Sequence, residues 1–322
     1  MNIEKLLIKK AIQKNKTIVF PEASFSQRIL VASQIIAKQK IANVILIGNE
    51  NLIEKLNYKN NIQIINPENY KNKKELANAI YDVRKQKGLT YEQAYELLND
   101  PIYFANAYVL CNFADGIVCG AEVSTAKTLK PALQLLKGKQ GLISSYFLFV
   151  GKNRVTDQVF MMGDCAVVEN PNANQLNTIA ELMLQESKKF NLIQPRFAFL
   201  SYSTCGSAKS DNIDKVRDAY LQFSKNNPNV KAIGEVQFDA SINKDVAKVK
   251  MPNYNFKKPA NMFVMPNIEA GNICYKTTQY FGGLKALGPI TLGFKKPVND
   301  LSRGSTVSDI VLVTAITCIQ CD

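Results

Sequence analysis

Short β-rich runs alternate with helical patterns over the first 140 residues, and this alternation constrains the fold more than any other feature of the chain. Four apolar, β-branched runs occur at 17–22, 42–48, 62–67 and 115–120. Apolar residues recur at helical spacing over 26–40 and 73–88, and the second of these patterns is expected to end at Gly88. Continuous apolar runs of this length are typical of parallel strands buried on both faces. The pattern therefore predicts an α/β fold with helices on both faces of the sheet.

A second unit is indicated after residues 138–141. Two strand-like runs, 143–151 and 158–168, are close enough in sequence to form a hairpin. A helical pattern then covers 173–190, with Asn172 or Asn174 as its expected N-cap. Three further runs, at 196–203, 231–238 and 261–267, have the composition of core strands. These elements predict a second sheet with its own helices.

Length, composition and cysteine usage are those of a globular intracellular protein. The chain has 322 residues, of which 46% are hydrophobic and 21% charged. Its longest apolar run, 141–151, is too short to cross a bilayer, which takes about 20 residues. The lysine-rich N-terminal segment lacks the features of a signal peptide, so we expect a cytoplasmic location. Seven cysteines without framework spacing indicate reduced thiols, and Cys318 and Cys321 have no second pair that would complete a metal site.

The basic residues are unevenly chosen. The formal net charge is +13, yet only six of the 40 basic residues are arginine. Arginine makes a forked, bidentate contact with an oxyanion that lysine cannot make, so the arginines are candidates for phosphate binding. The lysines are dispersed and are not interleaved with aromatic residues, which argues against a nucleic-acid surface. The six arginines are Arg28, Arg84, Arg154, Arg196, Arg217 and Arg303.

The chain contains no histidine, and this restricts its possible chemistry. Ser-His-Asp triads and histidine bases are excluded, so proton transfer near neutral pH would use a carboxylate, lysine, tyrosine or cysteine. Asp309 lies six residues after Arg303 in the segment NDLSRGSTVSD and is a candidate base. No P-loop and no G-x-G-x-x-G motif follows a strand, which weakens ATP and NAD as catalytic cofactors.

Three further segments carry candidates with competing interpretations. The loop STCGSAKSD at 203–211 follows a strand and would suit phosphate, although an ordinary turn with Ser210 or Asp211 as helix N-cap is the simpler interpretation. Gly271 and Asn272 are candidates for the start of a helix facing an anion. Arg84 lies near a predicted helix C-terminus, where the helix dipole alone explains a cation.

These motifs together resemble the phosphate acetyltransferases. The blocks VRKQKGLT, ADGIVCGA, GDCAVVENPNANQL, LSYSTCGSAKSDNIDKV, EAGNICYK, GGLKALGPI and PVNDLSRGSTVSDIV occur in the family's order, and the resemblance runs from about residue 17 to the end. The same motifs extend to phosphate butyryltransferases and to the C-terminal region of large malic enzymes. The resemblance implies acetyl transfer between coenzyme A and inorganic phosphate, which gives acetyl phosphate.

The resemblance also implies an architecture and a set of partners. It implies two α/β/α domains with mainly parallel sheets, an active site in the interdomain cleft and a homodimer. The first domain would comprise 1–140 plus 293–322, and the second 141–292. Coenzyme A, acetyl phosphate and phosphate would be the small-molecule partners. No metal or other cofactor is expected, and no nucleic-acid or membrane partner.

The resemblance assigns roles residue by residue. Asp309 would take the proton of the coenzyme A thiol, Arg303 would hold the phosphate and the developing oxyanion, and Ser302 would donate a hydrogen bond to the reacting groups. The remaining arginines, Arg154, Arg196 and Arg217, are expected to serve the surface. The expected substrate-binding residues are Arg84, Lys130, Ser124, Thr125, Asn272, Tyr275 and Lys276, and the expected coenzyme A-binding residues are Arg28 and Ser207.

The chain departs from the family pattern in one segment. The family usually has G-A-x-H-T-T-A-D-T-x-R-P where this chain reads GAEVSTAKTLKP at 120–131. Val123 stands in place of histidine, Lys127 in place of aspartate and Lys130 in place of arginine. Lysine keeps the charge but loses the fork. A phosphate butyryltransferase, a non-catalytic homologue and, in another class, a nucleic-acid-binding protein are therefore the alternatives.

Overall fold

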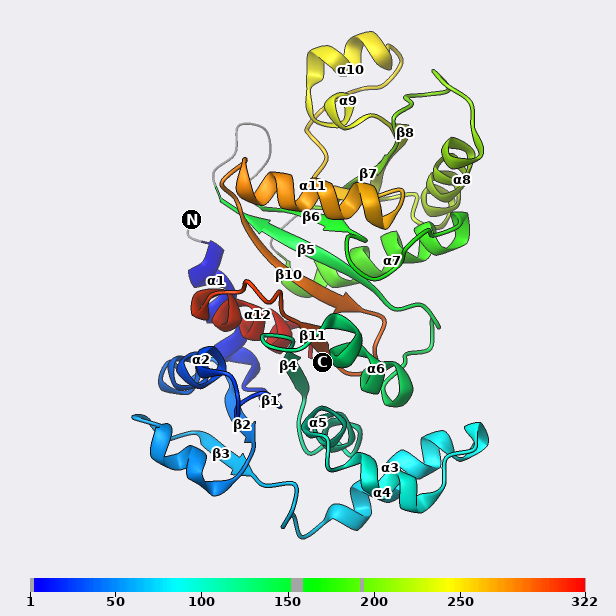
Figure 1. Ribbon diagram of the computed structural model, residues 1–322. Coiled ribbons are helices and arrows are strands. Elements are labelled where there is room, and N and C mark those ends of the chain that lie inside the picture. Colours follow the sequence, from blue (N-terminus) through cyan, green and yellow to red (C-terminus); the bar gives the residue numbers. More distant parts are fainter. Residues whose placement is uncertain (1–2, 152–158, 192–193, 322) are drawn as a thin grey trace. The chain divides into compact units, whose positions relative to one another are not determined.

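The computed structural model describes residues 3–151, 159–191 and 194–321 and divides the chain into two compact units. The first unit comprises Met1–Gly141 and Phe294–Asp322, and the second comprises Leu142–Gly293. Each unit contains one sheet with helices packed against it (Figure 1).

The sheet of the first unit is entirely parallel among its described pairings. Its strand order is β11-β4-β1-β2-β3. The central strands are short, rich in valine and isoleucine and buried, as expected for strands covered on both faces. The strands are β1 (Thr17–Phe20), β2 (Asn43–Ile47), β3 (Ile62–Ile65), β4 (Gly116–Cys119) and β11 (Val298–Asp300).

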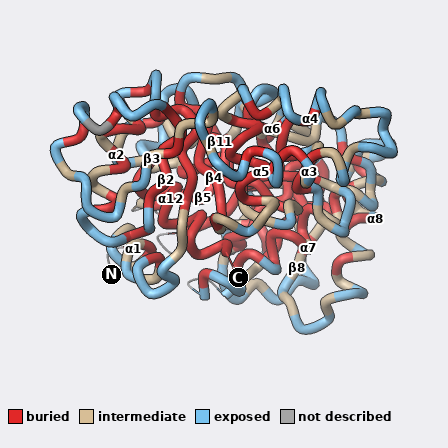
Figure 2. The backbone as a smooth tube through the Cα atoms, turned by 90° about the horizontal axis from the view of Figure 1, so that it is seen from below, coloured by how far each residue is buried: buried red, intermediate tan, exposed pale blue. Residues whose placement is uncertain are grey.

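The helices of the first unit surround this sheet. The last helix, α12, is buried along almost its whole length and contacts α1, α2 and β4 (Figures 1 and 2). This contact joins the C-terminal segment to elements formed by the first 120 residues. The helices are α1 (Ile3–Lys14), α2 (Gln27–Lys38), α3 (Lys73–Arg84), α4 (Tyr91–Leu97), α5 (Pro101–Leu110), α6 (Thr125–Leu135) and α12 (Val307–Gln320), with 3-10 turns η1 (Glu50–Lys55) and η2 (Lys85–Lys87).

The sheet of the second unit is mixed. Its order is β10-β5-β6-β9-β7-β8, with antiparallel β10–β5 and β5–β6 pairs and parallel pairs in the rest. The strands are β5 (Ser144–Val150), β6 (Val159–Gly163), β7 (Arg196–Leu200), β8 (Lys231–Val236), β9 (Met262–Val264) and β10 (Lys285–Leu292). The helices are α7 (Ala173–Phe190), α8 (Asp211–Asn226), α9 (Phe238–Ile242), α10 (Lys244–Lys250) and α11 (Ile268–Tyr280).

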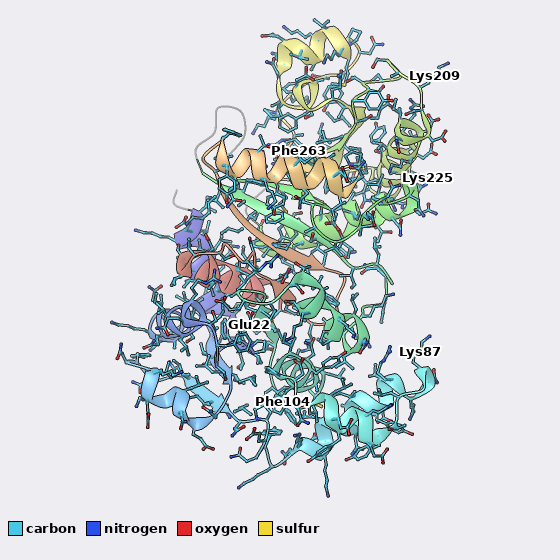
Figure 3. The ribbon with its side chains drawn as sticks, viewed as in Figure 1. Glu22, Lys87, Phe104, Lys209, Lys225 and Phe263 are labelled. Atoms are coloured by element: carbon cyan, nitrogen blue, oxygen red, sulfur yellow. The ribbon has the colours of Figure 1, made fainter. Side chains whose placement is uncertain are left out.

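Each unit has its own apolar core. Phe104 lies in the core of the first unit and Phe263 in that of the second; both are labelled in Figure 3. No helix among the described residues is long and apolar enough to cross a membrane.

The predicted fold class, α/β with mainly parallel sheets, is confirmed, and several local predictions are confirmed with it. The hairpin prediction corresponds to the antiparallel β5–β6 pair, although residue 158 lies outside the described residues. Gly88 ends the η2 turn in a left-handed conformation, and Asn172 caps α7. One prediction is wrong: Gly271 and Asn272 do not begin a helix, because Asn267 caps α11 and the helix starts at Ile268.

Candidate functional site

Three loops meet at the carboxyl ends of neighbouring parallel strands in the first unit. Glu22 follows β1, residues 120–124 follow β4, and residues 301–306 follow β11. In the sheet order β11-β4-β1, these three strands are adjacent. Ligands of open parallel α/β sheets bind outside the carboxyl ends of the strands. This edge therefore holds the candidate site of the unit.

Glu22, labelled in Figure 3, shapes the loop after β4. It is fully buried, and its carboxylate accepts hydrogen bonds from the backbone N–H groups of Ala121, Glu122 and Val123 at 2.9, 2.8 and 3.0 Å. A buried carboxylate requires such donors, because an uncompensated charge in the interior is costly. The loop that leads into α6 is thus held from inside by one charged side chain.

Arg28 ties that loop to the loop after β11. Its Nη1 donates to the carbonyl oxygens of Arg303 and Ser305, each at 2.8 Å, and its Nη2 donates to the Ala121 carbonyl and to Glu122 Oε1. Hydrogen bonds from Ser26 and from Arg28 lower the pKa of Glu122. The observed contacts give Arg28 a positioning role, and its coenzyme A-binding role stays a prediction.

Asp300, the last residue of β11, is a buried carboxyl with an incomplete set of partners. Its Oδ2 accepts a hydrogen bond from Thr125 Oγ1 at 2.6 Å, whereas its buried Oδ1 has no hydrogen-bond partner among the described residues. A Cβ atom at Gly120 would collide with the same carboxylate. Burial raises the pKa of Asp300 to about 6, and the hydrogen bond from Thr125 opposes this rise.

Ser302 and Arg303 lie on the exposed part of the loop after β11. The Ser302 carbonyl accepts a hydrogen bond from Ser305 N–H at 2.8 Å, and its hydroxyl oxygen accepts one from Gly304 N–H at 3.4 Å. Among the described residues, no carboxylate forms an ion pair with the Arg303 guanidinium. Arg303 is thus fixed through its backbone, while its side chain reaches solvent.

Asp309 lies in the first turn of α12 and forms a capping box with Thr306. Its Oδ2 accepts hydrogen bonds from the Thr306 N–H and hydroxyl groups at 2.9 and 2.8 Å, and its own N–H donates to Thr306 Oγ1 at 3.2 Å. The side chain is half-buried. A structural role as helix cap is therefore observed, and a role as base stays a prediction.

Arg84 acts on Tyr103, and Tyr103 bonds to the helix that carries Lys130. Arg84 ends α3, which contacts α6, and its charge opposes the rise in the pKa of Tyr103 that burial and Asp100 cause. The Tyr103 hydroxyl donates to Gln134 of α6 at 2.9 Å. Lys130 lies one helical turn before Gln134, hence on the same face of α6. Lys130 is exposed, as is Ser124, which caps α6.

The loop around Ser207 in the second unit uses its backbone donors internally. The buried Glu235 carboxylate accepts from Ser203 Oγ and Gly206 N–H at 2.9 and 2.7 Å. The N–H groups of residues 204, 205, 207 and 208 also have protein partners. Backbone donors of residues 204–208 are thus engaged within the protein, and the coenzyme A-binding role of Ser207 stays a prediction. The turn interpretation is confirmed, with Ser210 as the N-cap of α8.

The α11 candidates differ in accessibility. Asn272 is half-buried and donates to the Cys165 carbonyl at 3.3 Å. Tyr275 is only 8% exposed and stacks on Phe147 with ring centroids 4.0 Å apart. Lys276 is exposed, and its ammonium lies 5.0 Å from the centre of the Tyr275 ring. Their substrate contacts stay predictions.

Two of the other arginines, Arg196 and Arg217, are partly exposed and also make structural contacts. Arg217 pairs with the buried Glu235 carboxylate at 2.8 Å. Burial alone would raise the pKa of Glu235, but the hydrogen bonds from Arg217 and the Ser203–Gly206 loop outweigh it and lower that pKa. Arg196 donates to the carbonyls of Pro259 and Gln194. Both arginines are structural, and Arg154 lies outside the described residues.

Sequence reasoning missed the two buried carboxylates of this edge, Glu22 and Asp300. Glu22 ends the predicted strand 17–22 and Asp300 lies in the segment NDLSRGSTVSD, but neither pattern indicates what the carboxylate contacts. A charged residue directly after an apolar strand was the available signal, since buried charges are rare unless they are paired.

Two α/β units, one with a parallel sheet and one with a mixed sheet, and with polar loops at the carboxyl ends of parallel strands, are typical of a ligand-binding α/β protein. A sequence model described as phosphate acetyl/butaryl transferase matches residues 2–318. The chain belongs to the phosphate acetyl/butaryl transferase family, which confirms the assignment made from the motifs.

Relatives and solved structures agree with this family. The chain is 42% identical to the phosphate acetyltransferase of Acetivibrio thermocellus, over 99% of this chain and 98% of that protein, and 41% identical to that of Bacillus subtilis, over 97% and 96%. The crystal structure of a phosphotransacetylase from Streptococcus pyogenes is similar with a TM-score of 0.92 and 38% identity, over 99% of both chains. The chain spans only 61% of the Helicobacter pylori phosphate acetyltransferase, with which it shares 41% identity over 98% of its own length.

Proposed function

We propose that this chain is a phosphate acetyltransferase, which exchanges an acetyl group between coenzyme A and inorganic phosphate. The observation that supports this most strongly is the full-length similarity to proteins of that name at about 40% identity. Acetyl phosphate and coenzyme A would be substrates, and no metal or redox cofactor takes part in the proposed reaction. We also propose a cytoplasmic location.

In the proposed reaction, the Asp309 carboxylate takes the proton of the coenzyme A thiol. The thiol has an ordinary pKa of about 8.5, so it is mostly protonated at neutral pH and gains from a nearby acceptor. The thiolate attacks the acetyl carbonyl of acetyl phosphate, a C–S bond forms, and the C–O bond to phosphate breaks. Phosphate leaves, and the proton on Asp309 passes to it or to water.

Arg303 and Ser302 would stabilise the charge that moves during this step. The guanidinium binds phosphate oxygens and the developing oxyanion, and the serine hydroxyl donates a hydrogen bond to the reacting groups. The backbone anchoring of residue 303 by Arg28 supports a preorganised loop. Arg84, whose charge acts on Tyr103, and Lys130 of α6 would add positive charge for phosphate, with Ser124 and Thr125 as hydroxyl donors.

A coenzyme A-dependent assay of thioester formation tests the proposal. Acetyl phosphate and butyryl phosphate are compared with the same preparation, and a parallel preparation of Asp309→Asn controls for contaminating host enzyme. We expect faster turnover with acetyl phosphate. Preference for butyryl phosphate would assign the chain to the butyryl branch, and the absence of turnover with either substrate would overturn the proposal.

A further inference from the structure

A basic pocket in the second unit lies away from the residues assigned to substrate binding. We call it the basic pocket. It has a volume of about 570 Å³ and is lined in part by Gln194, Arg196, Lys231, Tyr254, Lys257 and Lys258. Small-molecule sites have volumes of about 300–1,000 Å³. The pocket is thus large enough for a small organic ligand.

The basic pocket opens at the amino edge of the parallel strands. Arg196 is the first residue of β7 and Lys231 the first of β8, and these two strands pair in parallel. Ser207 and Asn272, by contrast, lie beyond the carboxyl ends of β7 and β9. The basic pocket and the candidate substrate residues of this unit are therefore at opposite edges of its sheet.

The charged residues that line the basic pocket are all positive. Four of its lining residues are cationic, and among the described residues that line it, none is acidic. Lys231, Lys257 and Lys258 are exposed to solvent. Several cations converging without carboxylates create a positive potential that attracts polyanions such as phosphate chains.

The walls of the basic pocket are held by buried polar contacts. Asn261 is fully buried; its Oδ1 accepts from Arg196 N–H at 2.9 Å and its Nδ2 donates to the Gln194 carbonyl at 3.1 Å. Arg196 Nε donates to the Pro259 carbonyl at 2.6 Å. The segments on either side of Arg196 are thereby fixed before any ligand arrives.

One wall of the basic pocket is aromatic and apolar. Tyr254 is 37% exposed and packs edge-on against Phe256, while Phe197 and Ile233 of the core also line the space. Burial raises the pKa of the Tyr254 phenol, so its hydroxyl stays protonated and able to donate. Aromatic side chains stack on planar rings of ligands, and apolar walls also favour the binding of such rings.

We propose that the basic pocket binds a nucleotide, with the phosphates on Lys231, Lys257 and Lys258 and the base against Tyr254. It contains no glycine-rich phosphate loop, so the phosphates would be held by side-chain cations and the site would serve binding rather than phosphoryl transfer. This inference does not depend on the proposed acetyltransferase activity.

Calorimetric titration of the full-length protein with ATP tests the proposal. We expect saturable binding, which the variants below assign to the basic pocket. Tripolyphosphate and adenosine serve as probes of each half of the ligand, and both should bind at least about tenfold more weakly than ATP, because each makes only part of the contacts. Tripolyphosphate binding as tightly as ATP would overturn the assignment.

Matched variants locate the site. Lys257→Glu combined with Lys258→Glu should weaken ATP binding by about tenfold or more, since both charges reverse. Tyr254→Leu should weaken ATP binding but leave tripolyphosphate binding unchanged. The control combines Lys55→Glu with Lys59→Glu, two exposed lysines of the first unit with the same change in net charge. Equal loss in the control would reduce the effect to net charge and refute the pocket. Acetyl transfer is measured on each variant and should be unchanged.

Discussion

Asp309 combines an observed structural role with a proposed chemical one. Its carboxylate accepts two hydrogen bonds from Thr306 at the start of α12. As the base it would also have to accept the thiol proton, for which an oxygen lone pair remains after these contacts. A substitution that removes the base should lower turnover, whereas one that removes the helix cap should lower stability.

Asp309→Asn should lower turnover by about 10²–10⁴-fold, the usual contribution of general-base catalysis. The amide oxygen can still accept from Thr306, so the melting temperature and coenzyme A affinity should change little. Thr306→Ala is the matched control. It removes the cap and should cost about 1 kcal/mol of unfolding free energy, while turnover per folded molecule is kept. A folded Asp309→Asn protein with near-normal turnover would refute the base assignment.

Arg303→Lys should lower activity although the charge is preserved. Loss of one bidentate contact to phosphate is expected to cost about 2–4 kcal/mol of transition-state stabilisation. Because the side chain is exposed and its backbone carbonyl is what Arg28 holds, the unfolding free energy should stay the same. Steady-state rates on acetyl phosphate measure the effect, and rates within about twofold of the unchanged protein would contradict it.

The raised pKa of Asp300 predicts how the free energy of unfolding depends on pH. Its pKa is raised from 3.8 to about 6, so the folded protein binds a proton that the unfolded chain releases between these values. The stabilisation from this group is therefore complete below about pH 3 and is lost as the pH rises through 6, a total change of about 3 kcal/mol. Asp300→Asn removes this dependence while an oxygen acceptor for Thr125 is kept.

The measurement is denaturant unfolding of both proteins at pH 4 and pH 7. The free energy of unfolding of Asp300→Asn relative to the unchanged protein should be about 2 kcal/mol higher at pH 7 than at pH 4, because the unchanged protein loses this stabilisation as the pH rises. Asp245→Asn, at a side chain that is 91% exposed, is the control and should show no such difference. An identical pH dependence in Asp300→Asn would show that Asp300 does not titrate in this range.

At the scale of elements, the loops after β4 and β11 act as one assembly. Glu22 holds residues 121–123 from the interior, and Arg28 joins the same loop to Arg303 and Ser305. The loops at the carboxyl ends of three strands are therefore joined by one network of hydrogen bonds. Such networks fix the geometry of groups that must stabilise a transition state.

Arg28→Lys tests whether the assembly matters more than direct ligand contact. Lysine keeps one charge but cannot make the four donations seen here. If Arg28 positions the loops, turnover should fall and the free energy of unfolding should drop by about 1–2 kcal/mol. If Arg28 instead binds coenzyme A, only the KM for coenzyme A should rise. Steady-state kinetics and denaturant unfolding on the same preparation separate these outcomes.

For the whole molecule, the two units have separate cores and different sheets. The first sheet is parallel throughout its described pairings, whereas the second carries an antiparallel edge made by β5, β6 and β10. Chain segments far apart in sequence complete the first unit, since β11 and α12 join strands formed before residue 120.

We expect the chain to form a homodimer, as its family resemblance implies. Sedimentation equilibrium should give twice the chain mass of 35.9 kDa. The expectation holds if the dimer persists on dilution to the concentrations used in the activity assay. A mass of one chain at those concentrations, with activity retained, would contradict it.

The sequence by itself determined the fold class, the positions of several strands and helices, the N-cap of α7 and the family. These features depend on interactions between residues close in the chain, such as apolar periodicity and the cap of Asn172 on α7. Motif order carried the family assignment and with it the candidate roles of Ser302, Arg303 and Asp309.

Only the tertiary structure decided which charged side chains hold the loops. Glu22 contacts residues about 100 positions away, and Arg28 contacts carbonyls about 275 positions away. Asp300 is buried with one carboxylate oxygen that has no hydrogen-bond partner in the part of the chain that the structure describes, a property that no sequence pattern encodes. The Gly206 amide likewise bonds to Glu235, 29 positions away, whereas the start of α11 was mispredicted although its Asn267 cap is a local contact. Hydrogen-bond partners and burial are set by segments that meet only after folding, and local periodicity carries no information about them.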